Sequence, residues 1–308
     1  MKRLRWKILY LLSGLALGCA AATSSPPSTP VVSTSSLTPG PASTEQPVPV
    51  RPFPQDSILK VINKWRADFP GQSAVACGPL DRPTLVSLNG DQTFEAASLV
   101  KLAILVELAR RFESGQCRPE DTLVFEERFR VGGSGHLQKE PAGGKYRLDK
   151  LGEWAISESD NVATDMLFDY LKLDTLEPAM RDLGLKQMTV QRTIFAFEEI
   201  ERGHDNLISA NDMALLLGKI ARQELPGSKW MLEVLGKTHR HDLLQAGLPK
   251  GLEVAHKSGE LTGFLHDAGI LFSQPPYVVV ILTRAEKADS ESFIRGLSRE
   301  IYECHQQP

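Results

Sequence analysis

The sequence predicts an α/β fold of the α+β type: an antiparallel sheet of about five strands, flanked by N- and C-terminal helices, with an all-α subdomain inserted into it. Short apolar runs typical of strands lie near both ends of the folded region, at 73–88 and 252–283. The stretch between them, about 118–245, has helical periodicity, and further helical patterns occupy 57–68 and 290–304. Strands that flank a helical middle imply this architecture.

Each element follows from a local pattern. Ser73–Cys77 and Thr84–Leu88, separated by Gly, Pro and Asp, predict a hairpin, and Asn89-Gly90 predicts a further turn. The predicted internal helices are Ser98–Ser114 (with Gly115 as its C-cap), Leu148–Ser157, Ala163–Leu171, Leu176–Leu183, Ala210–Arg222 and Lys229–Leu235. The predicted C-terminal strands are Leu252–Lys257, Ala268–Phe272 and Tyr277–Thr283. We place the helical insertion at about 110–250.

Composition excludes several classes of protein. The chain has 308 residues, of which 42% are hydrophobic and 24% charged, enough to bury a core. The formal net charge of −3 lacks the basic excess of a nucleic-acid binder, so we expect no nucleic-acid partner. The only long apolar run, Ile8–Gly18, is too short to span a bilayer, which excludes a polytopic membrane protein.

The N-terminus has the pattern of an export segment. In residues 1–18, basic residues precede the apolar run, as in a signal peptide. Cys19 follows directly and resembles the lipidated cysteine of a bacterial lipoprotein; ordinary cleavage after Ala22 is the alternative. Residues 19–54, rich in Pro, Ser and Thr, predict a disordered tether before a folded domain at 55–308. We expect a periplasmic or cell-envelope protein that is lipid-anchored or, in the alternative, secreted and soluble.

Three cysteines follow Cys19 in the sequence: Cys77, Cys117 and Cys304. An exported protein meets an oxidising compartment, so one pair could be bridged, and buried free thiols are the alternative. Their spacing does not suggest a zinc site.

A candidate nucleophile lies at the start of the strongest predicted helix, Ser98-Leu99-Val100-Lys101. Residues three apart share one helix face, so the Lys101 amine can approach the Ser98 hydroxyl, and a serine needs such a base to become a nucleophile. A helix-capping serine is the simpler interpretation, and Ser-x-x-Lys is expected about once by chance in a chain of this length. This motif alone decides nothing.

Two further segments change that. Ser159-Asp160-Asn161 lies between two predicted helices, where helix capping is an equally good interpretation. Lys257-Ser258-Gly259 ends a predicted strand, where a solvated lysine would be ordinary. In this order the three segments match Ser-x-x-Lys, Ser-Asp-Asn and Lys-[Thr]-Gly, the signature of class A β-lactamases and penicillin-binding proteins. The chain resembles this family over about 57–305.

Three other segments support the resemblance. They are the loop Gly132–Leu137, which resembles the loop that borders the family's site, and the segments Asn206–Met213 and His266–Ile270.

The resemblance implies a role for each motif residue. Ser98 would be the acylated nucleophile, and Lys101 its base or proton relay. Ser159 would pass a proton to the leaving nitrogen, while Asn161 would bind the substrate amide.

The resemblance assigns binding of the substrate carboxylate to the third motif, Lys257-Ser258-Gly259. Lys257 would set the electrostatics of the site and help to bind a substrate carboxylate, with Ser258 and Gly259 beside it. Backbone N–H groups of Ser98 and Glu260 would form the oxyanion hole.

One family feature is missing. Class A enzymes carry Glu-x-x-x-Asn between the second and third motifs, and that Glu activates the deacylating water. No Asp or Glu between Asn161 and Lys257 has an Asn four residues later. Glu198, Glu199 and Glu201 occupy this region, but a solvated helix face is their simpler interpretation. Because losing a positioned base costs roughly 10²–10⁴-fold in rate, we expect slow deacylation.

A metal site is not expected. His239-Arg240-His241-Asp242 is similar to part of a metallo-β-lactamase ligand run, but the ligand set does not close, and a surface helix is the better interpretation. We expect no metal, no cofactor, and membrane contact only through the lipid anchor.

The sequence therefore predicts a monomeric serine hydrolase that acts on a β-lactam or a peptidoglycan-type substrate. The alternatives are a penicillin-binding D,D-peptidase or esterase that uses the same serine, and a sensor domain that is acylated once without turnover.

Overall fold

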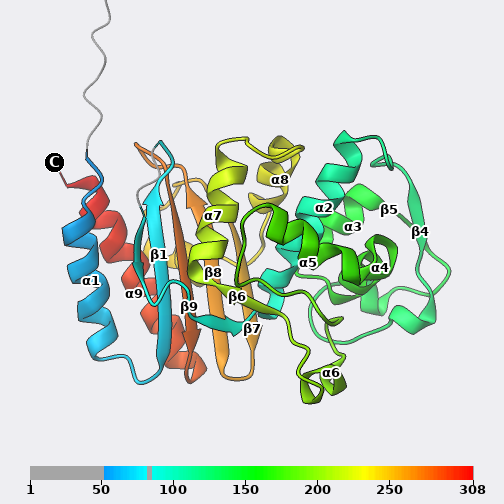
Figure 1. The fold of residues 1–308 in the computed structure, drawn as a ribbon, viewed down its shortest axis with the longest axis horizontal. Coiled ribbons are helices and arrows are strands. Elements are labelled where there is room, and N and C mark those ends of the chain that lie inside the picture. Colours follow the sequence, from blue (N-terminus) through cyan, green and yellow to red (C-terminus); the bar gives the residue numbers. More distant parts are fainter. Residues whose placement is uncertain (1–51, 82–84, 308) are drawn as a thin grey trace, which may run out of the picture. The chain divides into compact units, whose positions relative to one another are not determined.

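A five-stranded antiparallel sheet is the centre of the structure, a computed structural model that describes residues 52–81 and 85–307. The strands lie in the order β2-β1-β9-β8-β7. They are β1 (Gln72–Pro79), β2 (Val86–Leu88), β7 (Val254–Leu261), β8 (Phe264–Leu271) and β9 (Tyr277–Arg284). Strands from the two ends of the domain meet where β1 pairs with β9, so the predicted sheet is confirmed (Figure 1).

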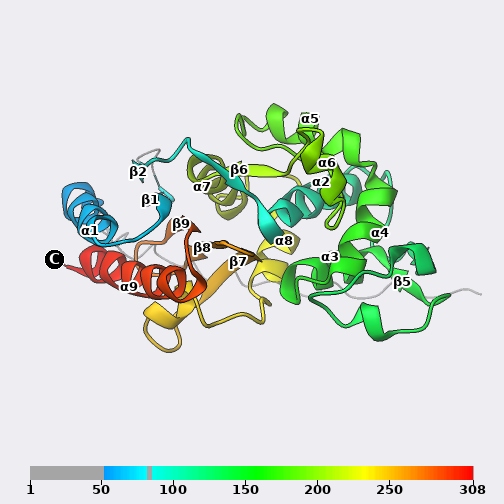
Figure 2. The same cartoon turned by 90° about the horizontal axis from the view of Figure 1, so that it is seen from below.

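Helices cover both faces of this sheet. On one face, α1 (Gln55–Ala67) and α9 (Lys287–Gln306) lie side by side, and α7 (Ala210–Ala221) packs against the other (Figures 1 and 2). Side chains alternate along the strands accordingly: in β9, Val279 packs in the core beneath α1 and α9, whereas Val280 packs in the core on the opposite face. Both faces of the central strands are therefore apolar.

The helical region is built around α2 (Lys101–Glu113), which is buried from its first residue to Ala109. A helix surrounded by others has no solvent face along this length, so Lys101 is carried into the interior with the apolar residues. The helices that contact α2 are α3 (Leu148–Ser157), α4 (Asn161–Leu171), α5 (Leu173–Asp182) and α8 (Ser228–Leu235).

Several short elements escape the sequence prediction. They are β3 (Thr93–Glu95), which pairs with β6 (Leu207–Ser209), β4 (Thr122–Val124), which pairs with β5 (Lys145–Arg147), and α6 (Phe197–Glu201). Strands of three residues are too short for a detectable period. The β3–β6 ladder joins the segment before Ser98 to the segment that follows residue 205.

Three predicted placements are wrong. Ser98 does not lie in an α-helix but in a 3₁₀ turn, Ala97–Val100, and α2 begins only at Lys101. Lys257-Ser258-Gly259 lies inside β7 rather than at its end, because pairing with β8 continues to Leu261. Residues 239–242 form an irregular segment after α8 and not a helix.

The predicted signal segment and Cys19 lie outside the described residues, as does the tether up to residue 51. Phe53, which the sequence assigns to the tether, is buried and packs its ring near Tyr277 and His305. Ordered packing therefore begins before residue 55. Within the described ranges, no helix is both long enough and apolar enough to cross a membrane.

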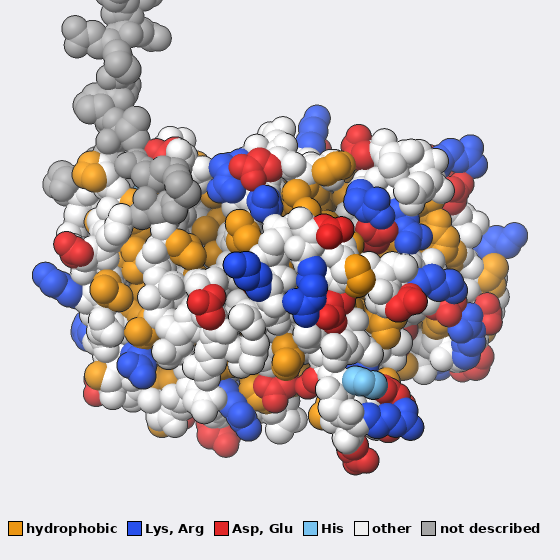
Figure 3. Space-filling view, viewed as in Figure 1, with side chains coloured by type: hydrophobic (Ala, Val, Ile, Leu, Met, Phe, Trp, Pro, Cys, Tyr) orange, Lys and Arg blue, Asp and Glu red, His pale blue; other side chains and the backbone are white. Residues whose placement is uncertain are grey.

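The cysteines at 77, 117 and 304 are buried free thiols, which is one of the two alternatives left open by the sequence. Burial raises the pKa of Cys77 to about 12, so this thiol stays protonated at neutral pH. On the face of the molecule in Figure 3, basic and acidic side chains are interspersed.

Candidate active site

Ser98 is positioned by the turn between β3 and α2. Ala97, which precedes it, has a positive φ of 45°, and the backbone N–H of Ala96 donates to the carbonyl of Asn206 at 2.8 Å. This fixed turn presents Ser98 to a cavity rather than to the helix end, and no side chain caps the 3₁₀ turn. The capping interpretation of Ser98 therefore fails.

Ser159 and Asn161 reach the same place from the α3–α4 connection. Ser159 has a positive φ of 55°, an unusual conformation for a residue with a side chain. Asp160 caps α4 by accepting the N–H of Ala163 at 2.9 Å and also accepts the N–H of Leu137 at 2.9 Å. Asp160 is therefore the helix-capping residue of this segment. Its neighbours Ser159 and Asn161 line the cavities instead.

Lys257 comes from β7, where Gly259 allows a close approach to the Ser98 turn. A Cβ on Gly259 would lie 3.0 Å from the Ala97 Cβ and 3.1 Å from the Ser98 backbone nitrogen. Only a glycine fits here without displacing the turn. The backbones of β7 and of Ser98 therefore lie side by side.

These side chains form one hydrogen-bonded chain. The Ser159 hydroxyl donates to Ser98 Oγ at 2.8 Å. Lys101 Nζ lies 3.2 Å and Lys257 Nζ 3.1 Å from Ser159 Oγ. Lys101 also bonds to the Ser159 carbonyl (2.7 Å) and to Asn161 Oδ1 (2.8 Å), so its link to Ser98 runs through Ser159 rather than directly along the helix face.

Both lysines are buried, and this changes their protonation. Burial, followed by the nearby Lys257 cation, lowers the pKa of Lys101 well below its ordinary value, although Asp160 and Asp165 oppose the shift. Burial also lowers the pKa of Lys257 to about 7, with Asp267 opposing and Arg240 reinforcing the change. A lowered pKa makes the neutral amine, which has a free lone pair, more accessible, so such a lysine can act as a base.

The serine opens into two cavities. One is a cleft of about 1540 Å³ bordered by Ser98, Ser159, Lys257 and Ser258 and by the residue Glu260. The other is a small pocket of about 190 Å³ that also contains Ser98. A cleft of this size accommodates a small-molecule substrate.

The loop predicted to border the site does so. Ser134, Gly135 and His136 line the cleft, and the Gly132 carbonyl accepts Asn161 Nδ2 at 3.0 Å. A Cβ on Gly135 would lie 2.2 Å from the Asp160 carboxylate, which explains a glycine at this point.

The segment 191–205 forms the opposite border, and hydrogen bonds within the segment fix its conformation. Arg192 is buried, pairs with Asp205 at 2.7 Å and donates to the carbonyl of Ile194 at 2.9 Å. The side-chain oxygen of Asn206 accepts the N–H groups of Gln191 and Arg192. Ile194 lines the small pocket beside Ser98.

The acidic residues of this segment do not line either cavity that contains Ser98. Glu199 instead pairs with Arg202 and lies 3.0 Å from His204. Glu198 and Glu201 are exposed. The expectation of a solvated helix face agrees with Glu198 and Glu201 in α6, whereas Glu199 is partly buried by its ion pairs.

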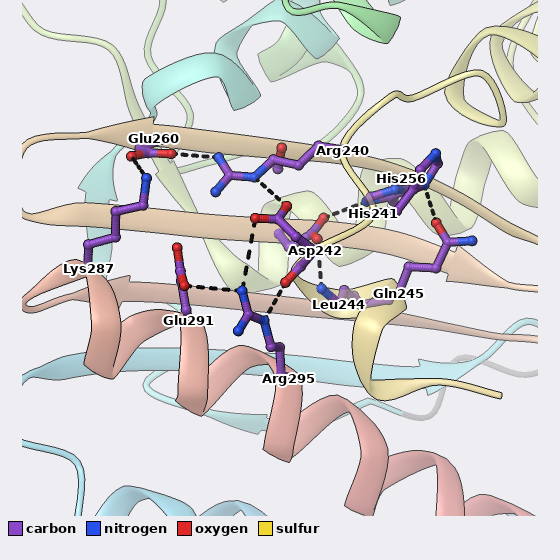
Figure 4. A network of polar contacts seen from close by, with 12 residues as sticks. Arg240, His241, Asp242, Leu244, Gln245, His256, Glu260, Lys287, Glu291 and Arg295 are labelled. Atoms are coloured by element: carbon purple, nitrogen blue, oxygen red, sulfur yellow. Dashed lines mark hydrogen bonds and ion pairs between the residues drawn. The ribbon is translucent and has the colours of Figure 1, made fainter. Parts of the chain in front are cut away.

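The segment 239–242 lines the cleft instead of forming a surface helix. Arg240 bonds to Asp242 at 2.9 Å and to Glu260 at 2.7 Å (Figure 4). Among the described residues, a different set has potential metal-ligand spacing: His136, Glu158 and Asp160. Its members are already engaged, since His136 lies 2.7 Å from Glu158 and Asp160 accepts two backbone N–H groups.

Sequence reasoning missed two residues near the site. Asp165, a buried carboxylate on α4, accepts the N–H of Ile194 at 3.2 Å and interacts electrostatically with Lys101. Its position four residues after Asn161, on the same helix face, was a usable signal. Arg240 gave no such signal, because its contacts depend on β7 and on the irregular chain after α8.

Comparisons with known proteins agree with this geometry. Residues 56–304 match the beta-lactamase enzyme family. Over 251 residues the chain is 23% identical to the extended-spectrum beta-lactamase PER-1 of Pseudomonas aeruginosa. The aligned region covers 73% of this chain and 80% of that protein.

Solved structures extend the likeness. A variant of PBP-A, in an acyl-enzyme complex with penicillin G, has a TM-score of 0.74 at 26% identity and covers 83% of this chain and 98% of that one. A beta-lactamase from Sphaerobacter thermophilus has a TM-score of 0.74 at 24% identity over 82% and 98% of the two chains, which shows a shared fold. This chain therefore belongs to the beta-lactamase enzyme family and has the fold of a class A β-lactamase-like serine hydrolase.

Proposed function

We propose that Ser98 attacks the carbonyl carbon of a β-lactam, or of a related acyl-D-alanine-type amide, and forms an acyl-enzyme that is hydrolysed slowly. The hydrogen-bonded chain from Ser98 through Ser159 to two buried lysines supports this proposal most directly. It supplies the nucleophile, a base and a route for protons within one cleft.

In the acylation step, Ser98 Oγ forms a bond to the carbonyl carbon while its proton moves toward Lys101 through Ser159. The C–N bond of the amide then breaks, and the Ser159 hydroxyl delivers a proton to the leaving nitrogen. Lys101 is suited to this task because its lowered pKa favours the neutral amine, whose lone pair can accept the proton. Asn161 holds Lys101 through Oδ1 and keeps one Nδ2 hydrogen for the substrate amide.

The negative charge that develops on the carbonyl oxygen would meet the backbone N–H groups of Ser98 and Glu260. The close approach of β7 to the Ser98 turn at Gly259 supports this pairing. Preorganised donors of this kind contribute about 3–4 kcal/mol to acyl transfer. Lys257 and Ser258 would bind the substrate beside them.

Slow deacylation follows from the opposite border of the cleft. A hydrolytic water needs a base near the acyl carbon, and none of Glu198, Glu199 and Glu201 lines the cavities that contain Ser98. Glu260 lines both cavities, but its carboxylate is engaged by Arg240 and Lys287. The acyl group would then persist, as in a penicillin-binding peptidase or a sensor. The likeness to the PBP-A variant, whose structure is an acyl-enzyme complex with penicillin G, supports a persistent acyl group.

An intact-mass time course of the mature chain with penicillin G, with drug consumption followed in parallel, tests the proposal. We expect one persistent adduct, abolished in Ser98→Ala and retained in the control Ser134→Ala, which alters another serine of the cleft. Rapid drug loss without adduct would contradict slow deacylation. An adduct that survives in Ser98→Ala would contradict the role of Ser98.

We also infer export with a lipid on Cys19, from the apolar segment that precedes it and the tether that follows. In a bacterial host, Cys19→Ala is expected to move the protein from the membrane fraction to the soluble fraction. An unchanged distribution would contradict the lipid anchor.

A further inference from the structure

Glu260 lies where the proposed chemistry takes place, although the motif assigns no task to its side chain. It follows Gly259 on β7, and the residue lines both cavities that contain Ser98. Among the described residues that line the small pocket, it is the one acidic residue.

The carboxylate of Glu260 is held between two cations. Its Oε2 accepts Arg240 Nη1 at 2.7 Å, and its Oε1 accepts Lys287 Nζ at 2.6 Å (Figure 4). Arg240 in turn donates to Asp242 at 2.9 Å. Charges of opposite sign thus alternate along this wall of the cleft, from Asp242 to Lys287.

This pairing changes what the wall can bind. Without Glu260, Asp242 would still pair with Arg240, and Lys287 would leave one net positive charge on this side of a cleft that already contains Lys257, so a substrate carboxylate would be attracted. With Glu260 in place, an incoming carboxylate must displace an existing carboxylate from its two donors or lie beside it. Like charges at such short range repel each other, and partial exposure of Glu260 moderates the effect.

We propose that Glu260 determines substrate specificity: it disfavours substrates with a carboxylate at this end of the cleft and favours those whose group there is uncharged or cationic. The inference rests on the proposed function, because it concerns substrates that acylate Ser98. Lys257 remains the cation available to a substrate anion, against the opposing charge of Glu260.

The variant Glu260→Gln tests this, since it removes the charge and keeps the side-chain shape and the backbone N–H. The probes are penicillin G, which has a free carboxylate, and its methyl ester. For each, the second-order rate constant of acylation is measured by intact mass. We expect a roughly tenfold rise for penicillin G and less than about a twofold change for the ester.

Glu291→Gln is the matched control, because Glu291 pairs with Arg295 of the same network and does not line the cleft. It should leave both rate constants within about twofold of the wild type. An equal change for both probes in Glu260→Gln, or no change, would overturn the inference. A wild-type chain that forms no Ser98-dependent adduct with either probe would refute the proposed function instead.

A second variant keeps the test decisive if thermal unfolding shows that Glu260→Gln does not fold. Lys287→Met removes one of the two cations that neutralise Glu260. It should slow acylation by penicillin G several-fold and leave the ester unaffected. Faster acylation by penicillin G in Lys287→Met would overturn the inference.

Discussion

The two borders of the cleft differ in how they are built. The border formed by α2, Ser159 and β7 presents Lys101 and Lys257 from the protein interior, and both amines are hydrogen-bonded to Ser159 and to a further neighbour. The segment 191–205 is fixed by Arg192 and Asn206, but its acidic side chains lie outside the cavities that contain Ser98.

The two borders also differ in how far each can change without loss of the fold. Groups proposed for acylation are part of the packed core, and replacing them disturbs buried partners. Groups suited to deacylation would come from a surface segment whose backbone is held by its own contacts. Such a segment can lack a carboxylate without loss of the fold, so the two half-reactions can be separated.

The largest expected effect is on the core border. Lys101→Met is expected to lower the acylation rate by roughly 10²–10⁴-fold, because it removes the proposed base at nearly constant volume. Intact-mass kinetics with penicillin G measure this change, and thermal unfolding confirms that the variant is folded. A rate within about tenfold of the wild type would show that Lys101 is not the base.

Adding a carboxylate, rather than removing a base, tests the segment 191–205. Ile194 lines the small pocket beside Ser98, so Ile194→Glu would bring a carboxylate to this border. We expect the acyl-enzyme to decay roughly 10²–10⁴-fold faster, measured after removal of excess drug. Ile194→Gln, which is similar in shape but uncharged, should not accelerate decay. Equal decay in both variants would mean that more than a base is missing.

The pH dependence of acylation separates the two lysines. As the pH falls through the lowered pKa of Lys101, the amine becomes protonated and the rate should decline. As the pH rises through about 7, Lys257 loses its charge, and acylation by penicillin G should fall by roughly tenfold while its methyl ester is unaffected. Profiles of kcat/KM for the two compounds test this, since they report the free enzyme. The same decline for both compounds would show that the Lys257 charge does not act on the carboxylate.

The smallest expected effect concerns the fit between β7 and the Ser98 turn. In Gly259→Ala, the new Cβ would lie 3.1 Å from the Ser98 nitrogen, so the turn must shift by a few tenths of an ångström. We expect acylation to slow by roughly tenfold, with a cost of about 1–3 kcal/mol in the free energy of unfolding. Gly132→Ala is the control, because its Cβ would have no neighbour within 4 Å. Equal rates in the two variants would argue against a need for this close approach.

Local patterns predicted the regular elements well. The helix Leu148–Ser157 has the predicted bounds, and α7 differs from its prediction by one residue at its end. Elements without a period were not predicted: β3 and β6 have three residues each, and their pairing depends on residues more than 100 positions apart. The motif at Lys257 was placed at a strand end because its Ser and Gly resemble a turn, whereas pairing with β8 carries the strand onward.

The sequence by itself determined the order of the longer helices and strands and the three motif segments, because periodicity, turn residues and motif spacing are local properties. The export segment at 1–18 and Cys19 remain predictions. Only the tertiary structure decided which side chains meet. Ser98, Ser159 and Lys257 come from separate elements, and their contacts exist because α2 and β7 pack around the same connection. Whether Arg240 lies on a surface or in the cleft, and what Glu260 neutralises, depends likewise on chain segments that local patterns do not relate.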